Sequence, residues 1–196
     1  MAYYHGYVTI PHQTYAEWKQ EVLNNFYDAD QIFNYQCMDL VMEFWWNVGF
    51  PQAYPHTSTG NADGVWSKRA ENLSYGGTTY FETVLSKESI KKGDIICYST
   101  SPYGHIGFAD IDYDAWTPDP DNPYEFPILS QNNGGLPDPS GTSAVNVAGY
   151  DIRDFQGAFR YIPWNTTPPT PPHPVAGRGR TNFPWVLYAR KLRNKM

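Results

Sequence analysis

Residues 34–46 read NYQCMDLVMEFWW, a cysteine followed by an apolar run. The apolar residues after Cys37 recur every three or four positions, which is the spacing of one face of an α-helix. The sequence therefore predicts a helix that begins near Cys37 and ends near residues 49–51, Gly-Phe-Pro. Cys37 then lies on the first turn, where unpaired N–H groups carry roughly half a positive charge and favour a thiolate.

Another helix is expected before this one, over residues 14–26. Residues 14–17 read TYAE, which has the form of a capping box, and large apolar residues follow with helical spacing. After the Cys37 helix, residues 51–64 are rich in Pro, Gly, Thr and Asn and predict a loop. A short helix is expected over residues 66–73.

From residue 86 the pattern changes to short apolar runs separated by turn residues, which is typical of strands. The expected strands cover residues 95–98, 105–111, 126–130, 145–150 and 157–162. Helices first and strands second indicate an α+β fold, with N-terminal helices packed on one side of an antiparallel β-sheet. The Pro- and Asp-rich segment 116–123 is expected to be a surface loop between two strands.

The length of 196 residues suits one domain with a sizeable core. Hydrophobic residues make up 41% of the chain, which argues against a disordered protein. We expect a catalytic domain over residues 1–164. Residues 165–176 form a proline-rich linker, and residues 177–196 form a basic, aromatic tail.

The charge is distributed unevenly along the chain. The net charge is −6, but residues 177–196 hold six cations and no acid, so the remaining residues carry −12. An acidic body argues against nucleic acid as a ligand and is compatible with a bound cation. The tail could contact an anionic wall polymer or a membrane surface, begin a further binding module, or be inert.

Cysteine usage and the N-terminus suggest where the protein is made. The two cysteines, Cys37 and Cys97, have neither CxxC nor zinc-site spacing, so we expect reduced thiols, with Cys97 buried in a strand. The first residues lack the basic and apolar regions of a signal peptide, and no apolar run reaches about 18 residues. We expect synthesis in a cytoplasm and, if the protein is exported, another route out.

Two further positions complete a candidate catalytic group. His105 lies in an expected strand, and Ser130, Gln131 and Asn132 lie at the end of another. A cysteine, a histidine and an orienting polar group together indicate thiol acyl-transfer chemistry.

Four short blocks together resemble the CHAP family of cysteine, histidine-dependent amidohydrolase/peptidase domains. They are QCMDL at residues 36–40, GDII at 93–96, GHIG at 104–107 and SQN at 130–132. The resemblance covers roughly residues 10–164. It implies a papain-like, NlpC/P60-type α+β fold and cleavage of amide bonds in bacterial peptidoglycan, as in phage endolysins.

The resemblance also implies roles for individual residues. Cys37 matches the family's nucleophile and His105 its general base, while Asn132 matches the family's asparagine. Ser130 stands where many members have a glutamate that orients the histidine, so Gln131 or Asn132 could take that role instead. The backbone N–H of Cys37 and the side chain of Gln36 are the expected oxyanion donors.

A calcium site is expected just before the catalytic helix. Asp28, Asp30, Ile32, Asn34 and Asp39 occupy relative positions 1, 3, 5, 7 and 12, which supply oxygen ligands in an EF-hand loop. Some phage endolysin CHAP domains are similar in carrying a calcium ion here. The chain departs from the EF-hand in having Phe33 at the glycine position and the shorter Asp39 in place of glutamate. The expected role of Ca²⁺ is structural.

The expected function is hydrolysis of a peptidoglycan amide bond, by an endopeptidase or an N-acetylmuramoyl-L-alanine amidase. We expect a phage lysin, made in the host cytoplasm and released by a holin or carried in the virion. One alternative is a catalytically weak wall-binding module or structural virion part. Another is a papain-like thiol hydrolase that acts on protein.

Overall fold

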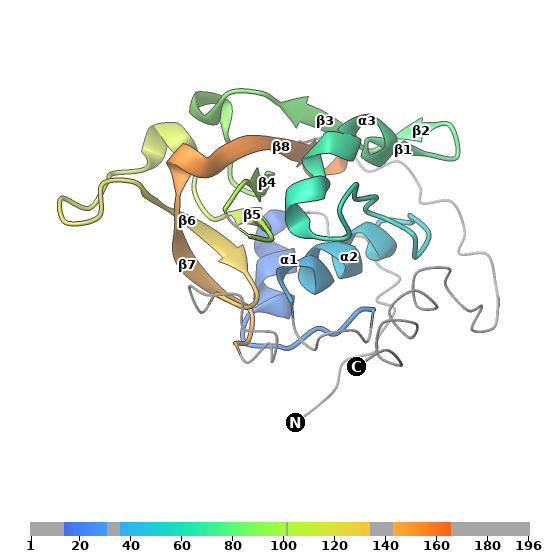
Figure 1. The fold of residues 1–196 in the computed structure, drawn as a ribbon, viewed down its shortest axis with the longest axis horizontal. Coiled ribbons are helices and arrows are strands. Elements are labelled where there is room, and N and C mark those ends of the chain that lie inside the picture. The colour runs from blue at the N-terminus through green and yellow to red at the C-terminus, as the bar shows by residue number, and fades with distance from the viewer. Residues whose placement is uncertain (1–13, 31–35, 101, 134–142, 166–196) are drawn as a thin grey trace.

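The computed structural model describes residues 14–30, 36–100, 102–133 and 143–165 (Figure 1). Its α-helices are α1 (Tyr15–Val22), α2 (Cys37–Asn47) and the short α3 (Arg69–Asn72). Its strands are β1 (Ser74–Tyr75), β2 (Thr78–Thr79), β3 (Phe81–Val84), β4 (Ile95–Tyr98), β5 (His105–Ala109), β6 (Glu125–Ser130), β7 (Asn146–Asp151) and β8 (Phe155–Tyr161). Short 3₁₀ turns cover Ala62–Gly64, Trp66–Lys68, Lys87–Ser89, Tyr113–Ala115, Ile152–Asp154 and Ile162–Asn165.

The main sheet has six strands in the order β3-β8-β4-β5-β6-β7, and every neighbouring pair is antiparallel. Strands β1 and β2 form a separate hairpin. Figure 1 shows α1 and α2 side by side against the sheet. The predicted α+β architecture, with helices packed on an antiparallel sheet, is confirmed.

An aromatic cluster joins both helices to the sheet. The ring of Phe44 on α2 lies 5.2 Å from Trp18 on α1 and 5.2 Å from Phe108 on β5, measured between centroids. Trp45 stacks on Phe81 of β3 at 4.3 Å. These side chains are fully buried, as the helical spacing of the apolar residues predicts.

The central strands β4, β5 and β6 bury both of their faces. Alternate residues of β5 point to opposite sides, so Phe108 packs in the core beneath the helices and Ala109 in a second core on the other face. On β6, Leu129 likewise packs in the core beneath the helices and Ile128 in the second core. Two-sided burial explains why these strands read as continuous apolar runs in the sequence.

Several elements differ from the sequence predictions, and the end of α1 differs most clearly. Helix α1 ends at Val22 instead of residue 26, because the chain turns at Asn24 (φ 65°) and bonds to the segment before β7. The N–H of Asn24 donates to the carbonyl of Val145 at 2.8 Å, and the N–H of Val145 donates to Asn25 at 2.9 Å. The sequence analysis also missed β3, an edge strand that pairs with β8.

No helix in the described part of the chain is long and apolar enough to cross a membrane. The predicted linker and tail lie outside the described residues, and the boundary at residue 164 stays a prediction. Trp164 itself packs on the core, with its ring 5.0 Å from Phe44.

Candidate active site

Cys37 is the first residue of α2 and lies against β5. Burial raises the pKa of the Cys37 thiol to about 11, although the backbone N–H groups of Ile106 and Met38 act in the opposite direction. The N–H of Ile106 belongs to the residue that follows His105 on β5. The helix N-terminus therefore brings the predicted nucleophile next to the strand that carries the predicted base, and the thiol is neutral at pH 7.

Asp39 holds the start of α2 in place. Its Oδ2 accepts a 2.6 Å hydrogen bond from the backbone N–H of Gln36, the residue that caps the helix. Its Oδ1 accepts from the N–H of Ala29 at 2.9 Å. One buried carboxylate thus ties the helix entrance to the segment that precedes it.

His105 is buried at the start of β5. Its Nε2 lies 3.0 Å from Oγ of Ser130 on β6. Its ring is parallel to that of Tyr150 on β7, with 3.9 Å between centroids and 9° between planes. Burial lowers the pKa of His105 to about 3, with the side chain of Asn133 acting the other way. The imidazole is therefore neutral at pH 7.

The hydrogen bonds around Ser130 identify the tautomer of His105. Nδ2 of Asn133 donates to the carbonyl of Ser130 at 2.9 Å and to Oδ1 of Asn146 at 2.7 Å, so Oδ1 of Asn133 faces Ser130. Oγ of Ser130 donates its hydrogen to that Oδ1. Because a hydroxyl has one hydrogen, Oγ of Ser130 must accept from Nε2–H of His105. The free lone pair of the imidazole is then on Nδ1.

Of the three candidate orienting residues, Ser130 makes the hydrogen bond to Nε2 of His105. Gln131 is buried and clamps the segment before α2: it accepts from the N–H of Tyr27 and donates to the carbonyls of Tyr27 and Gln36. Asn132, in the left-handed region at φ 59°, donates from Nδ2 to Oε1 of Gln36 at 2.9 Å. The structure thus links Gln131 and Asn132 to the predicted oxyanion donor.

Three residues of the site were missed by the sequence analysis. Asn133 and Asn146 continue the hydrogen-bond chain beyond Ser130, and Tyr150 covers one face of His105. Asn133 directly follows the SQN block, which was the one available signal. The contacts of Asn146 and Tyr150 depend on how β7 pairs with β6, which the sequence does not reveal.

Cys97 is fully buried on β4, directly opposite Ile106 of β5. Burial raises the pKa of its thiol further than that of Cys37. The described structure therefore offers Cys37, which is half-buried, as the reactive thiol of the two.

The structure brings together three of the predicted calcium ligands. Asp28, Asp30 and Asp39 each offer a carboxylate oxygen, and these oxygens lie within 4.8 Å of one another. Burial raises the pKa of Asp39, and the neighbouring charges of Asp30 and Asp28 raise it further. An all-oxygen set with this repulsion suits a hard divalent cation. The other two predicted ligands, Ile32 and Asn34, lie outside the described residues.

Comparison with known proteins places this site in context. Residues 26–114 match the family model of the CHAP domain. A D-alanyl-L-alanine endopeptidase of Streptococcus phage B30 is 34% identical over 103 residues, covering 50% of this chain and 22% of that protein. Endolysin PlyTW of Staphylococcus phage Twort is 27% identical over 146 residues, covering 71% of this chain and 27% of that protein. The chain thus spans about a quarter of the length of these relatives.

A solved structure supports the fold. The wild-type endolysin LysIME-EF1 superposes with a TM-score of 0.50 and 21% sequence identity, covering 74% of this chain and 61% of that one. The family match includes both Cys37 and His105 and ends before Ser130. The predicted resemblance is confirmed over residues 26–114, which match the family model of the CHAP domain.

Proposed function

We propose that this protein hydrolyses an amide bond of bacterial peptidoglycan, with Cys37 as nucleophile and His105 as general base. The observation that carries the proposal is the placement of His105 beside the Cys37 helix, with Nε2 held by Ser130 and Nδ1 left as the base. The CHAP match and the phage lytic enzymes among the relatives support peptidoglycan as the substrate.

The reaction begins from a neutral thiol and a neutral imidazole. Nδ1 of His105 accepts the proton of Cys37 as the sulfur attacks the carbonyl carbon, so the base acts during the attack. The resulting imidazolium gives the proton to the leaving amine. Water, activated by the same imidazole, then hydrolyses the thioester and releases the acid.

The oxyanion is stabilised by the backbone N–H of Cys37 and the side chain of Gln36. Oε1 of Gln36 accepts from Nδ2 of Asn132 at 2.9 Å, so the group that this side chain would offer to the oxyanion is its Nε2–H. Asn132 thereby acts as a positioning residue for the oxyanion site. Such a donor typically contributes about 10²–10³-fold to kcat.

The bond we favour is a peptide bond of the wall, because one relative is named an endopeptidase. The amidase reaction uses the same catalytic groups and differs in the shape of the substrate groove. Mass spectrometry of digested sacculi distinguishes the two reactions. An endopeptidase cuts within the peptides and leaves peptide attached to the glycan, whereas an amidase cuts the amide bond between the lactyl group of the glycan and the first alanine.

The decisive experiment compares the wild-type protein with Cys37→Ala on purified sacculi. We expect the wild type to lower turbidity and release new amines, and the variant to do neither while keeping its melting temperature. Cys97→Ala is the matched control for thiol loss and should retain activity when folded. A wild-type protein that sediments with sacculi and releases no amines would instead be the wall-binding module.

For the carboxylate cluster we propose a structural Ca²⁺ ion held by Asp28, Asp30 and Asp39. The ion would supply positive charge that offsets the repulsion among the three side chains and stabilises the entrance to α2. Excess Ca²⁺ should raise the melting temperature of the chelator-treated protein, and Asp30→Asn should weaken that response. Asp121→Asn, on an exposed loop, is the control. A melting temperature indifferent to both chelator and Ca²⁺ contradicts the ion.

A further inference from the structure

We infer that Tyr150 is a positioning residue whose ring face stabilises the imidazolium of His105 in place of a carboxylate. The inference deepens the proposed function, because it concerns the charge that His105 acquires when it takes the proton of Cys37. In that step the S–H bond breaks, an N–H bond forms at Nδ1 of His105, and the electron pair stays on sulfur for the attack.

The geometry of the two rings carries the inference. Their centroids are 3.9 Å apart and their planes differ by 9°, so the imidazole lies flat over the phenol ring. Two neutral aromatic rings prefer centroid separations of about 4.5–7 Å with an offset or an edge contact. A cation, by contrast, is attracted to the negative face of a tyrosine ring. The contact therefore suits a charged His105 better than a neutral one.

The hydrogen-bond partners described around His105 supply no negative charge that would stabilise its imidazolium. Ser130, which accepts from Nε2–H, is neutral, and so are Asn133 and Asn146 behind it. Burial lowers the pKa of His105 and the side chain of Asn133 raises it, and no carboxylate is among the causes in the described structure. A buried imidazolium without a counter-ion is costly. The Tyr150 face is the contact that can offset this cost without moving.

The ring of Tyr150 is supported by its neighbours. Tyr150 pairs with Phe126 of β6, and its ring lies 5.8 Å from that of Tyr98, a fully buried residue on β4. Tyr98 is in turn the cross-strand partner of His105. Strands β4, β5, β6 and β7 thus hold the two stacked rings in one arrangement, before and after proton transfer.

The experiment compares three side chains at position 150. Tyr150→Phe keeps the aromatic ring and removes the hydroxyl. Tyr150→Leu keeps an apolar side chain over His105 but has no aromatic ring. Pentafluorophenylalanine keeps the shape of the ring but makes its face electron-poor. The first readout is the rate at which iodoacetamide alkylates Cys37 at pH 7 with Ca²⁺ in excess. His105→Ala gives the alkylation rate without a base. The buried Cys97 is the internal control, because we expect it not to react. This readout needs no wall substrate.

We expect Tyr150→Phe to alkylate within about twofold of wild type, and the Leu and pentafluoro variants about tenfold to thirtyfold more slowly, as loss of a desolvated cation–π contact implies. Turnover of sacculi should show the same order in kcat with KM unchanged. Wild-type rates in the Leu and pentafluoro variants overturn the inference, as does an equal loss in Tyr150→Phe. If the wild type alkylates rapidly but hydrolyses no wall, the proposed function fails and the inference stands.

Discussion

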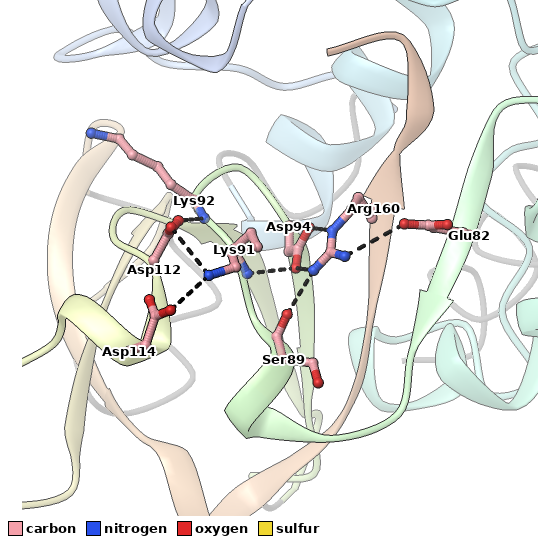
Figure 2. A network of polar contacts seen from close by, with 8 residues as sticks. All are labelled: Glu82, Ser89, Lys91, Lys92, Asp94, Asp112, Asp114 and Arg160. Carbon is pink, nitrogen blue, oxygen red and sulfur yellow. Dashed lines mark hydrogen bonds and ion pairs between the residues drawn. The ribbon is translucent and has the colours of Figure 1, made fainter. Parts of the chain in front are cut away.

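Two polar networks of this protein lie on the same sheet and differ in charge. At the junction of β4 and β8, Asp94 receives two hydrogen bonds from the guanidinium of Arg160, at 2.9 and 2.7 Å (Figure 2). Lys91, nearby, pairs with Asp112 and Asp114. At the active site, the chain from His105 through Ser130 and Asn133 to Asn146 contains no formal charge.

The difference in charge matches the difference between a structural network and the proposed catalytic one. Asp94 is buried, which raises the pKa of its carboxyl, and the two hydrogen bonds from Arg160 act in the opposite direction. In the proposed reaction, His105 gains and loses a proton in each cycle. The neutral chain fixes the direction of the ring, and it does not raise the pKa of the imidazole as a neighbouring carboxylate would.

The largest expected effect comes from breaking the charged network. Asp94→Ala leaves Arg160 without its buried partner and should lower the free energy of unfolding by about 3 kcal/mol. Urea denaturation measures this change. The activity of the protein that remains folded should be near that of wild type, and a large loss of kcat with unchanged stability would contradict the structural role.

Removing the hydroxyl of Ser130 tests the neutral network. Ser130→Ala leaves Nε2–H of His105 without its acceptor and should reduce kcat about tenfold to a hundredfold, since a buried unpaired donor costs about 1–3 kcal/mol. The wild-type imidazole should show the Nε2–H tautomer in ¹⁵N NMR spectra. An Nδ1–H tautomer would contradict the assigned direction of the chain.

Asn133→Ala sharpens the same comparison with a smaller effect. Ser130 remains, but its hydroxyl loses the acceptor that directs its hydrogen away from His105. We expect kcat to fall less than in Ser130→Ala, by about fivefold to tenfold, the scale of one neutral hydrogen bond. Steady-state kinetics on sacculi measure both variants side by side. A larger loss than in Ser130→Ala would contradict this order.

A separate effect, on stability as a function of pH, comes from Glu43. Burial, with the charge of Glu21, raises the pKa of Glu43 to about 7. The native state then binds more protons than the unfolded state between about pH 4.5 and 7, so this residue's contribution to stability falls as pH rises through that range. Glu43→Gln should therefore stabilise the protein by about 1–2 kcal/mol at pH 8 and not at pH 4. Thermal melts at both pH values check this, and equal shifts at both would contradict it.

Some features followed from local sequence patterns. The α2 helix was predicted from the spacing of its apolar residues, and it covers Cys37–Asn47. The GD pair at residues 93–94 is also explained locally, because Gly93 has φ 92° and a Cβ there would lie 3.0 Å from Trp164. The N–H of Lys91 donates to Oδ2 of Asp94, which closes the same turn.

Other features could not be predicted because they depend on how distant segments pair. The early end of α1 results from backbone bonds to Val145, more than a hundred residues away. Strand β3 is short and lies at the sheet edge, and its two buried residues in four positions give a weak sequence signal. The same reason applies to Asn146 and Tyr150, whose places follow from the register of β6 and β7.

The sequence by itself determined the α+β fold, the helix at Cys37 and the candidate pair of Cys37 and His105, because apolar periodicity and short motifs are encoded locally. Only the tertiary structure decided that Ser130 orients His105, that Asn132 binds Gln36 and that Tyr150 covers the imidazole. These contacts join β5, β6, β7 and the start of α2. Side-chain partners across strands depend on register, and a shift by one residue would turn each of these groups to the opposite face.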